Sequence, residues 1–450
     1  MNAGSTTAES GAARFSRRVV LTMAARSSIA VCSLITGLII AHTLGKNGLG
    51  VVATLAVVTL LAIQIAGLGL PSAITYVTAR GEHSPRTVLM RSVLIALIAG
   101  TLAALIVIAA VWIRPALFGD VSVRLLTLTA IALPFQLMMS FSLALYLGME
   151  RIGAYNLLEV AIPMLVLGNA VVTLAVFDAG LDEFVLVGVI LSAGVAGVAL
   201  VHLFRSTPGD AVERHADGSL LSVMFSSGAR FFVAMAAVSI ILRGDLLLVN
   251  YFRGSGEAGV YAVATQWATL MHMMPNVIST LLFPRVAGAR DESGKVTCRV
   301  TRNSVVLMLA LCLVAAPAAF AIPVLYGAGF SAATAQFLIL LPGVFLLGIE
   351  TILVQHFSGQ GLPVAIPMLW VIALVMSLGL NVAFVPSYGA IAAATVSSLT
   401  YGLMFLLVAL LFRRETGCTF SETFVASWPE IRGLLHPGSA LRSGRANGGG

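Results

Sequence analysis

The chain alternates between long apolar runs and short polar breaks along most of its length. Twelve runs are long enough to be helices that cross a bilayer, because about 20 apolar residues in a helix span roughly 30 Å of hydrocarbon. Their approximate ranges are 27–44, 50–78, 88–113, 125–148, 157–177, 184–204, 222–252, 258–282, 303–326, 334–357, 364–385 and 389–412. The pattern predicts an all-α polytopic membrane protein with about twelve transmembrane helices.

The composition excludes a water-soluble protein. Hydrophobic residues make up 59% of the 450 positions and charged residues only 10%, which no soluble domain of this size shows. The net charge of +7 does not indicate a nucleic-acid partner, because the basic residues do not cluster on a soluble face. The four cysteines have neither a disulfide framework nor the spacing of metal ligands, so we expect no metal site.

The basic residues instead follow the topology of the predicted helices. Of the 26 Lys and Arg residues, 21 fall in alternate breaks on one side, one lies within a span, and four lie on the other side, namely Lys46, Arg114, Arg124 and Arg253. Cytoplasmic loops of membrane proteins carry the excess of Lys and Arg. We therefore expect both termini in the cytoplasm.

Short matches between the two halves of the chain recur at a nearly constant offset. Gly45 and Gly50 match Gly254 and Gly259 at an offset of 209, Gly148 matches Gly359 at 211, and Asn169 matches Asn381 at 212. Together they indicate a duplication of six helices. Six is an even number, so the copies would share one orientation and be related by an axis along the membrane normal.

The duplication divides the chain into five parts. We expect a cytoplasmic segment at 1–26, a six-helix bundle at 27–204, a cytoplasmic linker at 205–221, a second six-helix bundle at 222–412, and a cytoplasmic tail without stable structure at 413–450. Two such bundles around a central cavity are the architecture expected for alternating access, in which the halves rock about a midplane site.

The stretch "ILRGDLLLVN", residues 241–250, places two charges inside an apolar run. A charged side chain there costs about 2.5–3.5 kcal/mol, so neither is expected to face lipid. Arg243 and Asp245 are two residues apart and point to nearly opposite faces of a helix. We expect Arg243 to line an aqueous cavity, with Asn250 on the same face, and Asp245 to be buried against another helix that supplies a donor.

Each of these residues has a functional and a structural interpretation. Arg243 contacts a diphosphate or a sugar acid through its bidentate fork, or it forms an interhelical ion pair. Asp245 is a structural partner or a proton or sodium site. Arg26 and Arg230 lie near the inner ends of the first helix of each half, where they meet an anionic headgroup or only follow the topology.

Four further polar residues lie within the predicted helices: Glu159, Asn169, Glu350 and Asn381. They are candidates for ion coupling or for structural hydrogen bonds. Glu159 falls in the first turn of its predicted helix, where a carboxylate favours the positive end of the helix dipole. The two asparagines are expected to join neighbouring helices.

Three stretches carry a resemblance to a known family: "AHTLGKNGLGVVA", "RGDLLLVNYFRGSGEAGVYAVA" and "LNVAFVPSYGAIAAATVSS". On these residues the chain resembles the polysaccharide or oligosaccharide flippases of the MOP exporter superfamily, which also holds the MATE drug exporters and the lipid-linked peptidoglycan precursor flippases. The resemblance implies a MATE-like fold and a flippase, not an enzyme, that moves isoprenyl-diphosphate-linked saccharides across the plasma (inner) membrane. It implies no cofactor and leaves coupling to H+ or Na+ open, with a glycan polymerase or glycosyltransferase as a candidate partner.

Three other functions are weighed against this one. An ion-coupled multidrug exporter would favour more acidic groups and less arginine in the cavity. A membrane enzyme of glycan assembly usually has a long external loop with catalytic residues, whereas the longest exterior loop predicted here has about ten residues. A non-transporting scaffold of a glycan assembly complex stays open.

Overall fold

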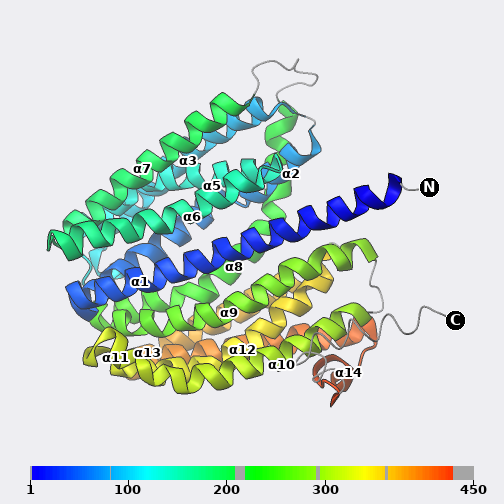
Figure 1. Ribbon diagram of the computed structural model, residues 1–450. Coiled ribbons are helices and arrows are strands. Elements are labelled where there is room, and N and C mark those ends of the chain that lie inside the picture. The colour runs from blue at the N-terminus through cyan, green and yellow to red at the C-terminus, as the bar shows by residue number, and fades with distance from the viewer. Residues whose placement is uncertain (1–2, 82, 208–217, 290–293, 360–362, 429–450) are drawn as a thin grey trace. The chain divides into compact units, whose positions relative to one another are not determined.

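The computed structural model describes residues 3–81, 83–207, 218–289, 294–359 and 363–428, and every regular element in these ranges is a helix (Figure 1). The first half comprises α1 Ala3–Gly67, α2 Leu70–Arg80, α3 Pro85–Ile113, η1 Pro115–Phe118, α4 Val123–Ile131, α5 Leu133–Gly148, α6 Ile152–Asn169, η2 Ala170–Val176 and α7 Leu181–Ser206. The second half comprises α8 Gly218–Arg253, α9 Ser255–Ala289, α10 Lys295–Ala318, η3 Ala319–Ala321, α11 Ile322–Tyr326, η4 Ala328–Phe330, α12 Ser331–Gly359, α13 Ala365–Thr416 and α14 Phe420–Phe424.

Nine segments in these described ranges are helical, long and apolar enough to cross a membrane. The predicted all-α membrane class is therefore confirmed for this part of the chain. Two of the nine, Ala25–Gly67 and Ala365–Thr416, contain a residue with non-helical backbone angles. These are Gly45 (φ 66°) in α1 and Gly389 (φ 61°) in α13, and glycine reaches such positive φ values at no steric cost.

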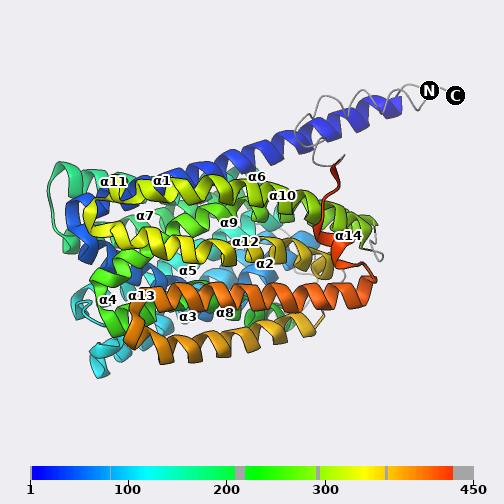
Figure 2. The same ribbon diagram turned by 90° about the horizontal axis from the view of Figure 1, so that it is seen from below.

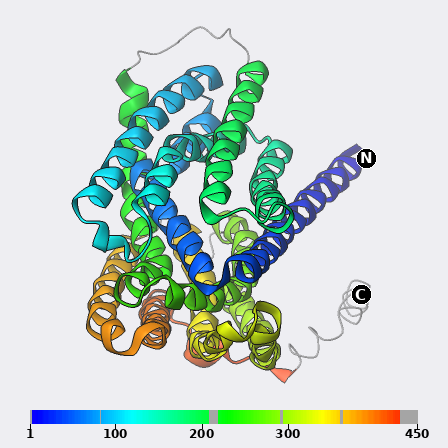
Figure 3. The same cartoon turned by 90° about the vertical axis from the view of Figure 1, so that its left-hand side faces the viewer.

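Each of these glycines lets the chain reverse, so that α1 and α13 have two arms apiece. Figure 2 shows the two arms of α13, and the reversal of α1 lies at the end of the molecule that faces the viewer in Figure 3. A run of 65 helical residues in α1 is far longer than a single crossing requires. The reversal lets it supply two crossings.

Two predicted spans are interrupted. The span at 50–78 breaks after α1, where Leu68 (φ 46°) and Gly69 (φ 72°) are left-handed and Pro71 stands in the first turn of α2. The span at 125–148 divides into α4 and α5 next to Pro134. Proline lacks the N–H that a helix interior requires, and its ring clashes with the preceding turn. The hydrophobicity of the sequence alone does not predict these breaks.

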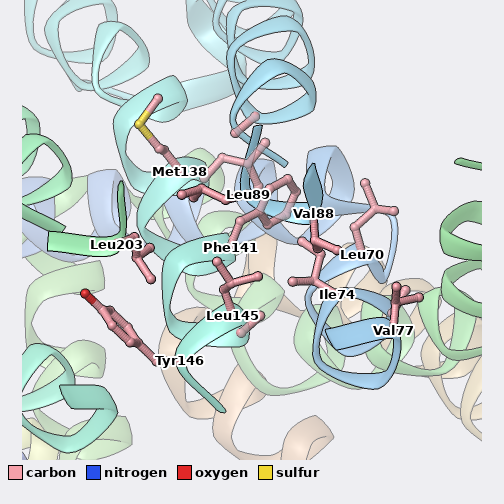
Figure 4. Close-up of a cluster of buried hydrophobic side chains, with 14 of the residues drawn as sticks. Leu70, Ile74, Val77, Val88, Leu89, Met138, Phe141, Leu145, Tyr146 and Leu203 are labelled. Carbon is pink, nitrogen blue, oxygen red and sulfur yellow. The ribbon is translucent and has the colours of Figure 1, made fainter. Parts of the chain in front are cut away.

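The described chain forms two compact units. Unit 1 comprises Met1–Val263, Leu325–Phe330 and Val385–Ala390, and unit 2 comprises Ala264–Val324, Ser331–Phe384 and Ile391–Gly450. The core of unit 1 joins α2, α3, α5 and α7 through buried side chains that include Ile74, Leu89, Phe141 and Leu203 (Figure 4). The predicted bundle boundaries at 204 and 222 stay a prediction.

Unit 2 contains most of α9 together with α10, α12 and most of α13. Leu282 and Val286 of α9 pack with Ile352 of α12 in a small buried cluster, and Val300 of α10 lies against it. A cluster with members from three helices holds their inner faces together, because the apolar side chains interlock at close-packed density.

The segment after Phe412 differs from the expectation of a structureless tail. α13 continues to Thr416, and α14 begins with a capping box in which Thr419 Oγ1 accepts from Glu422 N (3.2 Å) and Glu422 Oε2 accepts from Thr419 N (2.8 Å). Hydrogen bonds from the backbone and then the hydroxyl of Thr419 hold the pKa of the Glu422 carboxyl below its usual range. Buried Thr423 meets Cys298 of α10 at 3.5 Å. Residues 429–450 lie outside the described ranges.

Candidate functional site

The two charges of the "ILRGDLLLVN" stretch have different surroundings on α8. Arg243 is partly exposed, whereas Asp245 is only 4% exposed. Asp245 Oδ2 accepts a hydrogen bond from the hydroxyl of buried Tyr261 on α9 at 2.5 Å, and Oδ1 accepts from the Leu246 N–H at 2.8 Å. Asp245 is thus a buried contact between two consecutive helices, which is the geometry that its structural interpretation requires. Its role stays a prediction.

Asn250, a candidate substrate contact, lies in a buried place near the end of α8. Its Nδ2 donates to the Phe118 carbonyl of η1 at 2.7 Å, and its side chain is 1% exposed. Gly119 follows η1 with φ 64°, and a Cβ there would lie 2.8 Å from Asn250 Nδ2. These contacts join Asn250 to the connection between α3 and α4, and its contact with substrate stays a prediction.

A hydrogen-bonded cluster surrounds the turn between α8 and α9; we call it the turn cluster, formed by Asp120, Arg253, Ser255, Glu257 and Ala390. Asp120 accepts from Ser255 N at 3.0 Å and from Ser255 Oγ at 2.7 Å. Glu257 accepts from Ala390 N at 2.7 Å and from Arg253 Nε at 2.8 Å. Three segments far apart in the sequence are thus joined, all within unit 1.

The glycine-containing turns that match at an offset of 209 pack directly against each other. A Cβ at Gly50 would collide with the Ser255 carbonyl and lie 2.8 Å from Gly259 N. A Cβ at Gly259 would collide with the Lys46 carbonyl and lie 2.8 Å from Gly50 N. The contact is reciprocal, because the offset of 209 relates Gly50 to Gly259 and also relates their partners, Lys46 and Ser255. Reciprocity of this kind is the property of a two-fold contact. This arrangement supports the duplication inferred from the sequence.

Arg26, on α1, lies near a polar pair on α6. The Tyr155 hydroxyl donates to Glu159 Oε1 at 3.1 Å, and Arg26 is close enough to act electrostatically on Tyr155. The sequence predicted Glu159 in the first turn of its helix. This prediction is wrong, because α6 begins at Ile152 and Glu159 lies in its third turn. The helix dipole falls off within one turn and no longer accounts for this carboxylate. The side chain of Arg230 lies outside the described part of the structure.

The remaining candidates, Glu350, Asn169 and Asn381, form hydrogen bonds with other parts of the protein. Glu350 of α12 is 3% exposed and accepts from Trp370 Nε1 of α13 at 3.0 Å. Asn169 donates to the Phe184 carbonyl at 2.9 Å and so links α6 to α7. Asn381 donates to the Ser377 carbonyl at 2.9 Å within its own helix, so this bond joins no second helix. The part that these residues play in ion coupling stays a prediction.

Sequence reasoning missed the members of the turn cluster and Tyr261. Asp120 and Ser255 are 135 positions apart, and neither stands inside an apolar run. The stretch "EAGVY", residues 257–261, was available as a signal because it contains Glu257, Gly259 and Tyr261 together. Among the described residues, no group of three or more His, Cys, Asp or Glu side chains lies close enough to hold a metal ion.

The long apolar helices of the described ranges define a multi-pass α-helical membrane protein, and comparison with solved structures shows that its fold is MATE-like. A solved MATE-family transporter of the MOP superfamily, in an inward-facing conformation, superposes with a TM-score of 0.72 over 89% of this chain and 98% of that chain, at 13% identity. The lipid II flippase MurJ, in an inward closed conformation, gives a TM-score of 0.68 over 92% and 96%, at 14% identity. At these identities the likeness shows the fold alone.

The sequence comparisons identify the family. The sequence model of the polysaccharide biosynthesis protein family matches residues 16–290, and the chain belongs to this family. A probable flippase, AglR of Haloferax volcanii, is 30% identical over 176 residues, which are 37% of this chain and 37% of that protein. The match thus spans little more than a third of the curated relative. The predicted membership of a polysaccharide family is confirmed by this match.

Proposed function

We propose that this protein flips an isoprenyl-diphosphate-linked oligosaccharide from the cytoplasmic to the outer leaflet of the plasma membrane, for the export of a cell-surface polysaccharide. Membership of the polysaccharide biosynthesis family supports a saccharide as the substrate, and the MATE-like fold supports transport as the activity. The name of the relative AglR, a probable flippase, points to the same activity. The protein carries out no covalent chemistry on its substrate.

The observation that carries the proposal is Arg243. It is a permanent, partly exposed cation within the apolar segment Met235–Arg253 of α8. A lipid diphosphate brings about two negative charges into a site of low dielectric, where a fixed cation attracts it far more strongly than in water. The guanidinium fork also matches the geometry of phosphate oxygens. We assign Arg243 to the diphosphate, with Arg26 and Arg230 as contacts nearer the cytoplasmic entrance.

The transport proposal includes twelve transmembrane helices with both termini in the cytoplasm. Nine segments of the described ranges qualify as spans, and the reversals at Gly45 and Gly389 would divide two of them. The 35-residue helix α9 is long enough to supply a further crossing. The clear excess of basic residues on one side supports the orientation.

Alternating access is the proposed mechanism. The hydrogen bonds of Asp120 with Ser255 and of Glu257 with Ala390 join the first predicted bundle, α8, α9 and the reversal of α13 at one end of the helices. Opening that end would break these bonds, and closing it would form them again. Coupling to H+ or Na+ through Asp245, Glu159 or Glu350 belongs to the same proposal, as does an interaction with a glycan polymerase or glycosyltransferase.

A multidrug exporter is the second candidate, because a solved MATE-family transporter has the same fold. Cationic drugs would be repelled by Arg243, whereas an anionic diphosphate is attracted to it. Susceptibility of a deletion strain to cationic drugs separates the two functions: a large rise in susceptibility with normal surface glycan would favour the exporter.

The test is complementation of glycan export in a deletion strain, with the amount of membrane protein measured in parallel. Arg243→Ala is expected to abolish export at a normal protein level, because the loss of a partly exposed side chain costs little packing. Arg243→Lys is expected to retain part of the activity, since lysine keeps the charge and loses the fork. Full export by Arg243→Ala at a normal level would overturn the assignment.

A further inference from the structure

Polar side chains recur along one face of α9, the helix that we propose as a further crossing. They are Thr265, Thr269, His272, Asn276 and Ser279, and all five lie in unit 2. Their spacing alternates between four and three residues, which places them on a single face of a helix. We propose that this α9 polar stripe binds the sugar hydroxyls of the transported saccharide; the proposal rests on the flippase function given above.

Hydrogen bonds fix two side chains of the stripe, His272 and Asn276. His272 Nε2 lies 3.0 Å from Thr351 Oγ1 of α12. Asn276 Nδ2 donates to the His272 carbonyl at 3.0 Å and lies 3.3 Å from His272 Nδ1. The imidazole and the amide therefore hold each other in a fixed orientation. Fixed side chains are what a recognition site for a flexible polyol requires, because less conformational freedom is lost on binding.

A comparison of Thr269 with Thr395 separates a polar helix face from a lipid-facing one. Thr269 is exposed, and its hydroxyl donates to the Thr265 carbonyl one turn earlier at 2.7 Å. Thr395 of α13 is also exposed and donates in the same way to the Ile391 carbonyl at 2.9 Å. Thr395, however, lies between Ile391 and Leu399, which are 50% and 61% exposed, as on a lipid-facing surface. Thr269 has polar neighbours one turn away in both directions.

The first copy of the repeat lacks this stripe. At the offset of 209, which the reciprocal contact of Gly50 with Gly259 supports, the equivalent positions are Ala56, Leu60, Ile63, Gly67 and Leu70. All five are apolar. A polar face that the shared fold required would be expected in both copies. Its presence in only one copy favours a function specific to that copy.

The chemistry of the stripe fits an uncharged sugar. Its hydroxyl, amide and imidazole groups both donate and accept hydrogen bonds, as sugar hydroxyls do, and none of them carries a permanent charge. Arg243, with its permanent positive charge, matches the diphosphate instead. The stripe therefore matches the neutral sugar part of the substrate and not its diphosphate.

The experiment measures binding of two probes to the purified full-length protein by titration in native mass spectrometry. One probe is the lipid-linked saccharide fraction extracted from the source cells, and the other is undecaprenyl diphosphate without sugar. Thr269→Val and Asn276→Leu are expected to weaken binding of the saccharide probe by about threefold to tenfold, the worth of one hydrogen bond, and to leave the bare diphosphate unchanged. Thr395→Val is the matched control and should bind both probes normally, whereas Arg243→Gln should weaken both.

Thermal unfolding of each variant shows whether it is folded, and Thr269→Val keeps the proposal testable if Asn276→Leu unfolds. Normal binding of the saccharide probe by folded Thr269→Val, or an equal loss for both probes, would overturn the stripe as a sugar-binding face. Wild-type protein that binds neither probe would count against the flippase function itself. The two failures are therefore distinguishable.

Discussion

The hydrogen bond between Asp245 and Tyr261 shows how a carboxyl group is accommodated in a membrane-spanning helix. Both side chains are buried, and the 2.5 Å separation of Oδ2 from the phenolic oxygen is short for such a bond. A buried polar group is costly unless it has hydrogen-bond partners. The phenol and the Leu246 N–H supply one partner for each carboxylate oxygen. The contact also ties the end of α8 to the start of α9.

Tyr261→Phe is expected to destabilise the protein by about 1–3 kcal/mol, because it leaves a buried acceptor without its donor. Asp245→Asn keeps an acceptor oxygen for the phenol and should lower the amount of folded protein less. Thermal unfolding in detergent and the amount of protein in the membrane measure both effects. Tyr251→Phe, at an exposed residue of α8, is the control. Equal stability of the Tyr261 and Tyr251 variants would contradict the argument.

At the scale of elements, the packing of the α8–α9 turn against the turn in α1 depends on two glycines. A methyl group at Gly259 would meet the backbone at Lys46 and Gly50, and backbone cannot move aside as a flexible side chain can. Overpacking of this kind costs about 1–3 kcal/mol. Gly259→Ala should therefore lower the unfolding temperature, whereas Gly379→Ala, in α13 with nothing within 4 Å, should be neutral or slightly stabilising. Differential scanning calorimetry compares the unfolding temperatures of the two variants. Equal unfolding temperatures would refute the close contact.

The sequence predicted which segments are helical more successfully than where the helices end. Apolar runs of about 20 residues identify crossings because lipid imposes that length. The reversals at Gly45 and Gly389, and the break at Leu68 and Gly69, depend on backbone angles that hydrophobicity does not encode. The polar contacts were harder still. Asp245 was expected to need a donor, but Tyr261 could be named only once the path of α9 was known, and the pairing of Asp120 with Ser255 joins distant segments.

At the scale of the whole molecule, the orientation in the membrane is the property that the sequence states most directly. We expect a reporter fused after Ser331 to lie outside the cell and one inserted within 208–218 to lie in the cytoplasm, because the basic residues concentrate on the cytoplasmic side. Alkaline phosphatase, active outside, and green fluorescent protein, fluorescent inside, measure the two locations. The reverse pattern, or an odd number of crossings, would refute the proposed topology.

The reciprocal contact between Gly50 and Gly259 has a consequence for how the protein could have changed over time. Before two copies were joined in one chain, identical subunits meeting in this way would have carried every substitution on both sides of the axis. A change that helped one side and harmed the other could not persist under that constraint. Fusion removes it, since each copy then varies alone. Apolar Leu60 and polar Thr269, at equivalent positions, are a divergence of the kind that a fused chain permits.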